Sequence, residues 1–423
     1  MLADKDPRLA GRVAFTHPNF VSYTLARFFI VVALEMQSVA VGWQVYEITK
    51  RPLDLGYVGL AQFAPGFVLF LFAGHAADLL DRRKLLMSCY AGYGLCSALL
   101  LAISWRAPQS VHLIYIVLAF VGVCRSFSFP VSRAILPHLV PEEHFTNAVA
   151  WNASTFQVAT IAGPALGGIA YAVFRGPHAV YALAVSVSIL SVLLTLRIHP
   201  LPTSALTEVT KKEPISLRTV FAGFRFIAEK KLILGSITLD MFAVLLGGAV
   251  ALLPVYAREI LHTGPWGLGL LRSAPGVGAA LMAIAVAHYP IRRHAGLTML
   301  LSVAAFGVCT ILFGISHSLI ISLIALFLTG AADMVSVIIR ATLIQVATPD
   351  EMRGRVNAVD MLFIGVSNEL GEFESGLTAQ WFGTVPAVII GGIGTLVVIA
   401  TWAWLFPELR KADELTVAEL MPK

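Results

Sequence analysis

The chain has 423 residues, of which 57% are hydrophobic and only 13% are charged, and its formal net charge is +5. A soluble globular protein is about 45–50% apolar and about 25% charged, so this composition excludes an ordinary soluble domain. The apolar residues extend along nearly the whole chain, and we therefore expect lipid to be the solvent for much of it. The four cysteines lie inside apolar segments and show neither metal-ligand nor disulfide spacing.

Twelve apolar stretches, each long enough to cross about 30 Å of hydrocarbon, follow one another along the chain. A polar segment, Met1–His17, precedes them, and we expect no cleaved signal peptide there. The first six spans are predicted at Phe20–Tyr46, Leu55–Ala77, Leu85–Trp105, His112–Ala134, Asn147–Phe174 and His178–Leu196. The last six are predicted at Ile233–Ala257, Gly267–Tyr289, Leu297–Ile315, Leu319–Leu343, Val356–Phe382 and Ala387–Phe406.

Basic residues indicate the orientation of these spans. With both termini in the cytoplasm, most of the 30 Lys and Arg residues fall in cytoplasmic segments, and the outer loops after the ninth and eleventh spans contain none. This distribution satisfies the positive-inside bias of membrane proteins. The positive charge therefore reports topology and does not support nucleic-acid binding.

The longest polar connection, residues 199–231, contains Pro200, Pro202 and Pro214 and then an amphipathic stretch, Leu217–Ala228. It is predicted to be a cytoplasmic linker with a helix along the membrane face. The chain then divides into a six-helix half at residues 1–198, this linker, and a second six-helix half at residues 232–423.

The two predicted halves repeat each other at a constant offset in numbering. Identities include Val45-Tyr46 with Val255-Tyr256, Ala64-Pro65-Gly66 with Ala274-Pro275-Gly276, Arg82-Arg83 with Arg292-Arg293, and Asn147-Ala148-Val149 with Asn357-Ala358-Val359. Two parallel six-helix repeats are typical of secondary transporters, which bind substrate near the bilayer midplane between the repeats.

The loop after the second span reads Gly74-His-Ala-Ala-Asp78-Leu-Leu-Asp81-Arg82-Arg83-Lys84. It resembles the signature loop of the major facilitator superfamily, GxLaDrxGrk, in which Gly74, Asp78, Arg82 and Arg83 match. The fragments Gly42-Trp-Gln-Val-Tyr46 and Met352-Arg-Gly-Arg-Val356 resemble the branch that contains the enterobactin exporter and macrolide-efflux-like pumps. The resemblance covers essentially the whole chain and implies a twelve-helix, all-α membrane fold.

The same resemblance implies roles for two motifs. The loop residues Gly74, Asp78, Arg82 and Arg83 are expected to act as a gate, with the arginines bound to acids or to helix C-termini. In the fifth span, Gly163-Pro164-Ala-Leu-Gly167-Gly168 is similar to the core of the antiporter motif, which favours export over import. Close packing through small residues is the alternative interpretation of this second motif.

Ionisable residues at bilayer depth cost at least about 2.5–3.5 kcal/mol on insertion scales, so each one requires an explanation. Glu35 in the first span has apolar neighbours, and desolvation favours its neutral form, which suits proton exchange. Arg125 lies in the fourth span, where antiporters of the superfamily often have a functional arginine. The alternative is that Glu35 is permanently paired with an arginine, which could be Arg125.

The second half contains most of the intramembrane acids. Glu369 and Glu372 are three residues apart and share a helix face, whereas Glu374 points elsewhere, and the first two are expected to share a proton or to bind a cationic substrate. Asp333 and Arg340 lie two turns apart, as a structural tether or a functional pair. The remaining candidates for proton or substrate binding are Asp240, Arg272 and Asp360.

These features favour proton-coupled export of an amphiphilic small molecule, such as a siderophore or a drug, by a monomeric protein of the bacterial inner membrane. Two alternatives remain open: proton-coupled uptake by symport, and a transport-inactive membrane receptor. The sequence contains no nucleotide-binding loop, metal-ligand spacing or nucleophile motif, so we expect neither an enzyme nor a cofactor or metal.

Overall fold

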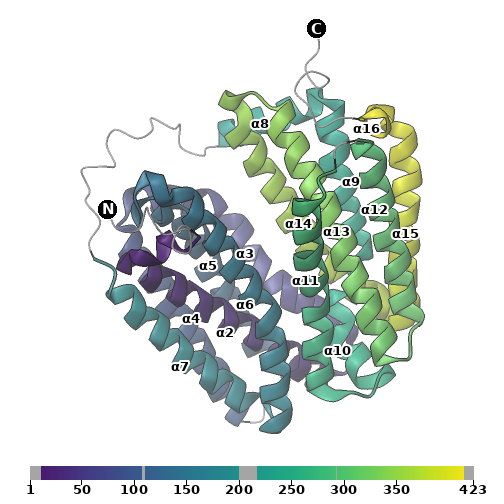
Figure 1. Ribbon diagram of the computed structural model, residues 1–423. Helices are drawn as coiled ribbons and strands as arrows, with labels where there is room; N and C mark the ends of the chain where they lie inside the picture. Colours follow the sequence, from purple (N-terminus) through teal and green to yellow (C-terminus); the bar gives the residue numbers. More distant parts are fainter. Residues whose placement is uncertain (1–10, 107–109, 200–216, 292, 414–423) are drawn as a thin grey trace. The chain divides into compact units, whose positions relative to one another are not determined.

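The computed structural model describes residues 11–106, 110–199, 217–291 and 293–413, which are helical without a strand (Figure 1). Within these ranges the side chains of residues 70, 71, 73–75, 77–79 and 217–220 lie outside the description. The chain forms two compact units. Unit 1 consists of Met1–Gln44 and Ala61–Pro214, and unit 2 of Val45–Leu60 and Ile215–Lys423. The end of the first long helix and the start of the second thus group with the later helices. The predicted division into residues 1–198 and 232–423 did not include this exchange of residues 45–60.

The helices of the first part of the chain are α2 (Pro18–Thr49), α3 (Pro52–Leu79), α4 (Arg82–Trp105), α5 (His112–Ile135), α6 (Phe145–Val173) and α7 (Pro177–Leu196). Short 3₁₀ turns are η2 (Val13–Thr16), η3 (Leu136–His138) and η4 (Glu142–His144). The later helices are α8 (Leu217–Glu229), α9 (Lys231–Gly247), α10 (Leu253–Val255), α11 (Gly264–His288), α12 (Ala295–Ile315), α13 (Leu319–Ala347), α14 (Asp350–Phe382), α15 (Thr384–Leu405) and α16 (Pro407–Lys411).

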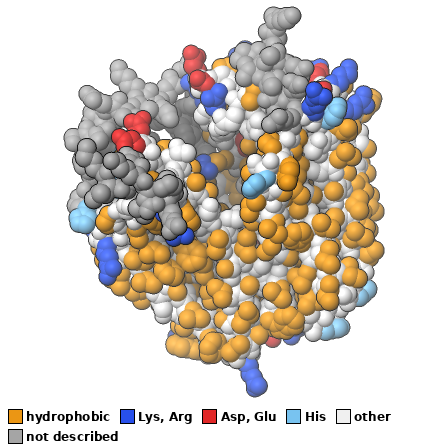
Figure 2. Space-filling model, viewed as in Figure 1, with side chains coloured by type: hydrophobic (Ala, Val, Ile, Leu, Met, Phe, Trp, Pro, Cys, Tyr) orange, Lys and Arg blue, Asp and Glu red, His pale blue; other side chains and the backbone are white. Residues whose placement is uncertain are grey.

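Ten helical segments in the described part of the chain are long and apolar enough to cross a membrane. With α3 and α14 they make up the predicted twelve, and the sequence of α14 shows why its hydropathy is lower, because it includes Glu369, Glu372 and Glu374. Hydrophobic side chains cover the flanks of the helices in Figure 2, and charged side chains gather near the helix ends. This distribution is the one that a hydrocarbon solvent requires.

The seventh predicted span is not one continuous α-helix. α9 ends at Gly247, and the chain continues through a 3₁₀ turn, η6 (Val250–Leu252), α10 and a π turn, η7 (Tyr256–Ile260). The pair Gly247-Gly248 has low helix propensity, and Pro254 has no N–H to donate, so a regular helix is interrupted here. Ser375 Oγ donates to the free carbonyl of Gly248 at 2.7 Å.

The amphipathic helix α8 packs against α14 in unit 2. The rings of Phe224 and Phe363 are 5.6 Å apart between centroids. A Cβ atom on Gly223 would lie 2.8 Å from the carbonyl oxygen of Arg355, so the two backbones approach closely. Ile227 is almost completely buried in this contact. The predicted linker helix therefore exists, and its apolar face is covered by α14.

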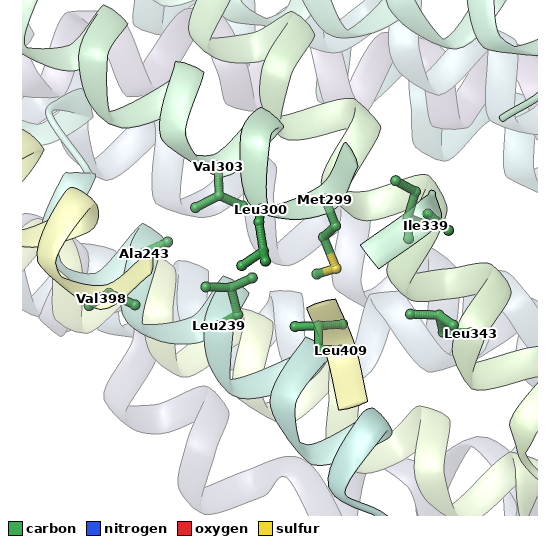
Figure 3. Packing of buried hydrophobic residues seen from close by; sticks show 10 residues of the cluster. Leu239, Ala243, Met299, Leu300, Val303, Ile339, Leu343, Val398 and Leu409 are labelled. Carbon is green, nitrogen blue, oxygen red and sulfur yellow. The ribbon is translucent and has the colours of Figure 1, made fainter. Parts of the chain in front are cut away.

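The core of unit 2 is built from side chains of four long helices. Leu239 of α9, Met299 of α12, Ile339 of α13 and Val398 of α15 converge, with Leu409 of α16 closing one end (Figure 3). Because lipid tails are as apolar as these side chains, hydrophobic burial alone does not hold such helices together, and close van der Waals packing must contribute.

Glycines permit this close packing between α11 and α13. A Cβ atom on Gly278 would lie 1.9 Å from the carbonyl oxygen of Phe327, and a Cβ atom on Gly330 would lie 1.9 Å from that of Pro275. Both obstacles are backbone atoms, so no side-chain rotation could relieve the clash. The two helices can therefore keep this contact only with glycine at these positions.

We expect Gly330→Val to lower the apparent melting temperature of the detergent-solubilised protein by several degrees, because α13 must separate from α11. The matched control is Gly354→Ala, whose Cβ atom would meet nothing within 4 Å. Alanine has a higher helix propensity than glycine by about 1 kcal/mol, so the control should be as stable as the parent or more stable. Equal melting temperatures for Gly330→Val and the parent would contradict this account.

Hydrogen bonds join the segment before α2 to α6 in unit 1. Asn147 accepts a hydrogen bond from the backbone N–H of Ala14 at 3.1 Å, and Trp151 Nε1 donates to the carbonyl of Gly11 at 2.8 Å. Beside them, His17 Nε2 and His144 Nδ1 are 2.9 Å apart. One ring must donate and the other accept, so this hydrogen bond requires that at least one ring is neutral.

Burial, and secondly the nearby His144, lower the pKa of His17 from its ordinary value of 6.5. Below pH 6.5 the unfolded chain therefore binds more protons at this residue than the folded chain does. The contribution of neutral His17 to the free energy of unfolding is complete above pH 6.5 and is lost as the pH falls. We expect the fall in melting temperature between pH 7.5 and pH 5.5 to be smaller in His17→Gln than in the parent. His112→Gln, at an exposed position, is the control and should behave as the parent does.

Candidate functional site

The loop between α3 and α4 is held by its polar side chains. Asp81 caps the N-terminus of α4, where its carboxylate accepts hydrogen bonds from the backbone N–H groups of Arg83 at 3.0 Å and Lys84 at 3.2 Å. An anion is favoured there by the free N–H groups and the helix dipole. The motif residues Gly74 and Asp78 lie in the part of α3 whose side chains are outside the description.

The two motif arginines bind the C-terminal ends of other helices. Arg82 Nη1 donates to the carbonyl of Ala134 near the end of α5 at 3.1 Å and also contacts His138. Arg83 Nη2 donates to the carbonyl of Leu196 at the end of α7 at 2.6 Å. Cations are favoured at these carbonyls, which lack partners within their own helices. Of the two kinds of partner expected for the arginines, the structure shows helix C-termini.

The antiporter-like motif packs α6 against α2 within unit 1. A Cβ atom on Gly163 would lie 2.4 Å from Cβ of Glu35, and one on Gly167 would lie 2.6 Å from Cα of Met36. Pro164 and Gly168 lie in the same segment of α6 and are also buried. The motif glycines therefore bring the backbone of α6 directly against the helical turn that carries Glu35.

The charged candidates of unit 1 and of α11 differ in their surroundings. Glu35 is partly buried beside Gly163, Arg125 is exposed on α5, and Arg272 is partly buried on α11. All three take part in polar or electrostatic contacts. The pairing of Glu35 with Arg125 stays a prediction.

A buried ion cluster joins three helices of unit 2. Arg340 Nη1 of α13 lies 2.9 Å from Asp240 Oδ2 of α9 and 3.2 Å from Asp360 Oδ1 of α14. The side chains of Arg340 and Asp240 are 5% and 7% exposed, and that of Asp360 is 16% exposed. Asp333, two turns from Arg340 on α13, is within electrostatic range of both Arg340 and Asp240. One arginine thus contacts two carboxyl groups, and a third lies within electrostatic range.

This cluster was only partly predictable from the sequence. Asp240 and Asp360 were candidates as separate residues, and Arg340 was considered with Asp333 on its own helix. The structure instead gives Arg340 two partners from other helices. Three carboxyl groups and one guanidinium thus lie close together in an apolar bundle, where an unbalanced charge is costly.

The acids of α14 divide into two sets, as their helical spacing predicts. The carboxyl groups of Glu369 and Glu372 are neighbours beside Gly59. A Cβ atom on Gly59 would lie 2.6 Å from Glu372 Oε2 and 3.2 Å from Glu369 Oε2. Glu374 instead accepts a hydrogen bond from Thr378 Oγ1 at 2.7 Å. The start of α3 therefore lies against the paired acids, with Gly59 beside both carboxyl groups.

Two contacts between the end of α2 and η7 were not anticipated. Tyr46 Oη donates to Glu259 Oε1 at 2.6 Å, and Arg258 Nη1 lies 3.4 Å from Glu47 Oε1. All four residues belong to unit 2, because the segment Val45–Leu60 groups with it. In the described part of the chain, no three or more His, Cys, Asp or Glu residues are arranged to hold a metal ion.

We expect Arg340→Gln to lower the free energy of unfolding by about 3–5 kcal/mol at neutral pH, because Asp240 and Asp360 would remain buried without their cation. The triple variant Asp240→Asn, Arg340→Gln, Asp360→Asn should recover part of this loss, since the two carboxyl groups that contact Arg340 are neutralised together with it. Arg225→Gln, which breaks an exposed pair with Glu229, is the control and should cost less than about 1 kcal/mol. Denaturant titration of the purified protein measures all three, and a triple variant less stable than Arg340→Gln would contradict the explanation.

Solved structures identify the fold. The chain is similar to the nucleoside transporter NupG, with a TM-score of 0.70 and 13% identity over 92% of this chain and 99% of that one. It is also similar to a bacterial homolog of the human lysosomal transporter Spinster, with a TM-score of 0.70 and 12% identity over 93% of this chain and 98% of that one. At these identities the likeness concerns the fold alone.

Sequence comparisons agree with this fold. Enterobactin exporters of Citrobacter koseri and of Shigella boydii serotype 18 are each 27% identical over 401 residues, which cover 94% of this chain and 94% of theirs. A family profile described as a transmembrane secretion effector matches residues 13–422. The chain therefore belongs to the transmembrane secretion effector family of the major facilitator superfamily, whose members are multi-pass membrane transporters.

Proposed function

We propose that the protein is a proton-coupled exporter of an amphiphilic small molecule of the siderophore type, acting in the bacterial inner membrane with both termini in the cytoplasm. The relatives that match the chain nearly from end to end are enterobactin exporters, which supports export as the direction and a siderophore as the first substrate to test. The positive-inside distribution of Lys and Arg supports the orientation.

The buried cluster of Asp240, Arg340 and Asp360 is the observation that supports proton coupling. Its carboxyl groups outnumber its arginine, and the third carboxyl group of Asp333 adds to the negative charge. Taking up a proton neutralises one carboxyl group and weakens its hold on Arg340, so the helices that carry these residues can change partners. In an antiporter, proton entry and substrate exit use the same conformational cycle in opposite directions.

In the proposed cycle the loop arginines and the paired acids of α14 would take part in the conformational change. Arg82 and Arg83 hold the cytoplasmic ends of α5 and α7, and these bonds would have to break or re-form as the transporter opens to the cytoplasm. Glu369 and Glu372 lie against Gly59, so a change in their charge acts directly on the start of α3. An alternating-access cycle requires each of these local contacts to have a second state, in which the present partners are separated.

Expression in bacteria that lack their own enterobactin exporter tests the proposal. We expect the protein to restore secretion of enterobactin, a protonophore to abolish that secretion, and Asp240→Asn or Asp360→Asn to abolish it at equal membrane abundance. Each variant removes a titratable carboxyl group while it keeps a similar shape. Glu229→Gln, on the exposed face of α8, is the control and should secrete as the parent does.

Three outcomes would contradict parts of this proposal. Secretion that persists in both aspartate variants and in the presence of a protonophore would exclude proton coupling through the cluster. Efflux of fluorescent amphiphilic cations without enterobactin secretion would replace the siderophore by a drug as the substrate. In everted vesicles energised by respiration, an exporter accumulates its substrate, so release of preloaded substrate would support uptake by symport instead.

A further inference from the structure

One face of α5 carries an exposed row of two arginines and a phenylalanine. Arg125, Phe129 and Arg133 are spaced four residues apart, and this spacing places them above one another on the helix. All three are exposed on the surface of unit 1, Phe129 to 48%. Arg125 and Arg133 also make contacts within the protein, so the row is part of an ordered surface.

The depth of Arg125 along α5 argues against contact of this helix face with lipid. Arg125 lies ten residues before the end of α5 at Ile135, which corresponds to about 15 Å along the helix. That depth is greater than an arginine side chain can span to reach the membrane interface, and a guanidinium in hydrocarbon costs at least about 2.5–3.5 kcal/mol. An exposed arginine at this depth is favoured only where it meets water or a polar ligand, and the same face of α5 carries Phe129 and Arg133.

A second arginine–aromatic pair comes from α2 and α6. Arg27 Nη1 donates to the carbonyl of Asn152 at 3.3 Å and also contacts the side-chain oxygen of Asn152. Its Cζ lies 4.9 Å from the centroid of the Phe156 ring, and 39% of Phe156 is exposed. Asn152 and Phe156 thus hold the guanidinium of Arg27 in one orientation while part of the ring stays accessible.

The two pairs lie near each other in unit 1. Arg133 Cζ lies 4.6 Å from the centroid of the Phe129 ring, and Arg27 is within electrostatic range of Arg133. A buried hydrogen bond of 2.8 Å from Tyr23 Oη to the carbonyl of Ser132 joins α2 to α5 close to both arginines. The two cations repel each other, and an anion bound between them would remove this repulsion.

We propose that Arg27 and Arg133, with the rings of Phe129 and Phe156, bind the acidic, aromatic end of the transported molecule. A guanidinium fork binds a carboxylate or a similar planar acidic group through paired N–H donors, and aromatic rings stack on the planar part of the same ligand. The substrate class is then an organic anion with an aromatic group, and not an amphiphilic cation. This proposal rests on the proposed function, because it names the class of molecule exported.

Three ligands with the same ring and different charge test the site. Purified full-length protein in detergent is titrated by isothermal calorimetry with 2-naphthoate, 2-naphthamide and 2-naphthylmethylammonium. We expect 2-naphthoate to bind about tenfold or more tightly than the neutral amide, the ammonium compound to bind most weakly, and the preference to fall as salt is raised. Arg133→Gln and Arg27→Gln should each remove most of the preference for the anion.

A control variant and the exposed position of Arg133 separate loss of ligand binding from loss of folding. Arg106→Gln is the control. Arg106 is an exposed arginine directly after the C-terminus of α4, far along that helix from Arg82 and Arg83, and the variant should keep the full preference for 2-naphthoate. Arg133 is exposed, so Arg133→Gln should fold even if Arg27→Gln does not, because Arg27 is tied to Asn152. Equal affinities for the three ligands in the parent, or an unchanged preference in Arg133→Gln, would overturn the site.

The secretion assay separates failure of the site from failure of the proposed function. A protein that secretes enterobactin in a protonophore-sensitive manner but shows no preference for 2-naphthoate is an exporter without this anion site. A protein that prefers 2-naphthoate through Arg133 but secretes nothing retains the anion site, and its proposed role as an exporter is then wrong.

Discussion

Lipid offers helices no hydrophobic reason to associate, and this constraint underlies the rest of the structure. The helices are held together by backbone contacts so close that a methyl group would not fit. A Cβ atom on Gly122 would lie 2.1 Å from the carbonyl oxygen of Gln62, which joins α5 to α3 in unit 1. The contacts of Gly278 and Gly330 join α11 to α13 in unit 2 in a comparable way. The glycines of the antiporter-like motif belong to the same class of contact, and they also place α6 beside Glu35.

The same solvent makes each charge within the helices costly, and the two units accommodate their charges differently. Unit 2 concentrates carboxyl groups around Arg340, whose guanidinium on α13 contacts Asp240 of α9 and Asp360 of α14 and neutralises part of their charge. Unit 1 instead carries arginines seated on aromatic rings, with Arg27 fixed by Asn152 and Arg133 exposed over Phe129. In the proposed cycle, proton binding belongs to unit 2 and recognition of an anion belongs to unit 1.

Equivalent residues of the two repeats make different contacts. Tyr46 and Tyr256 are equivalent in the repeat, but Tyr46 Oη donates to a carboxylate, Glu259, whereas Tyr256 Oη donates to the carbonyl of Gly314 at 2.9 Å. The segment around Tyr256 is also a π turn, and that around Tyr46 is a regular α-helix. Since π turns insert one residue into a helical ladder and often occur at functional sites, the second repeat has diverged where the first kept a plain helix.

The sequence alone determined the class of protein, the helices and the family. Hydropathy is a property of local composition, so twelve spans, the amphipathic α8 and the relation of Glu369 to Glu372 could be predicted from spacing. The interruption after Gly247 could have been suspected from the Gly-Gly pair and Pro254, because these residues weaken a helix wherever they occur. Only the tertiary structure decided which charges meet. Arg340 could have paired along its own helix with Asp333, yet Asp240 and Asp360 reach it from α9 and α14. Likewise, the proximity of Arg27 to Arg133 depends on how α2 and α5 pack, and packing between helices is not encoded in the hydropathy of either one.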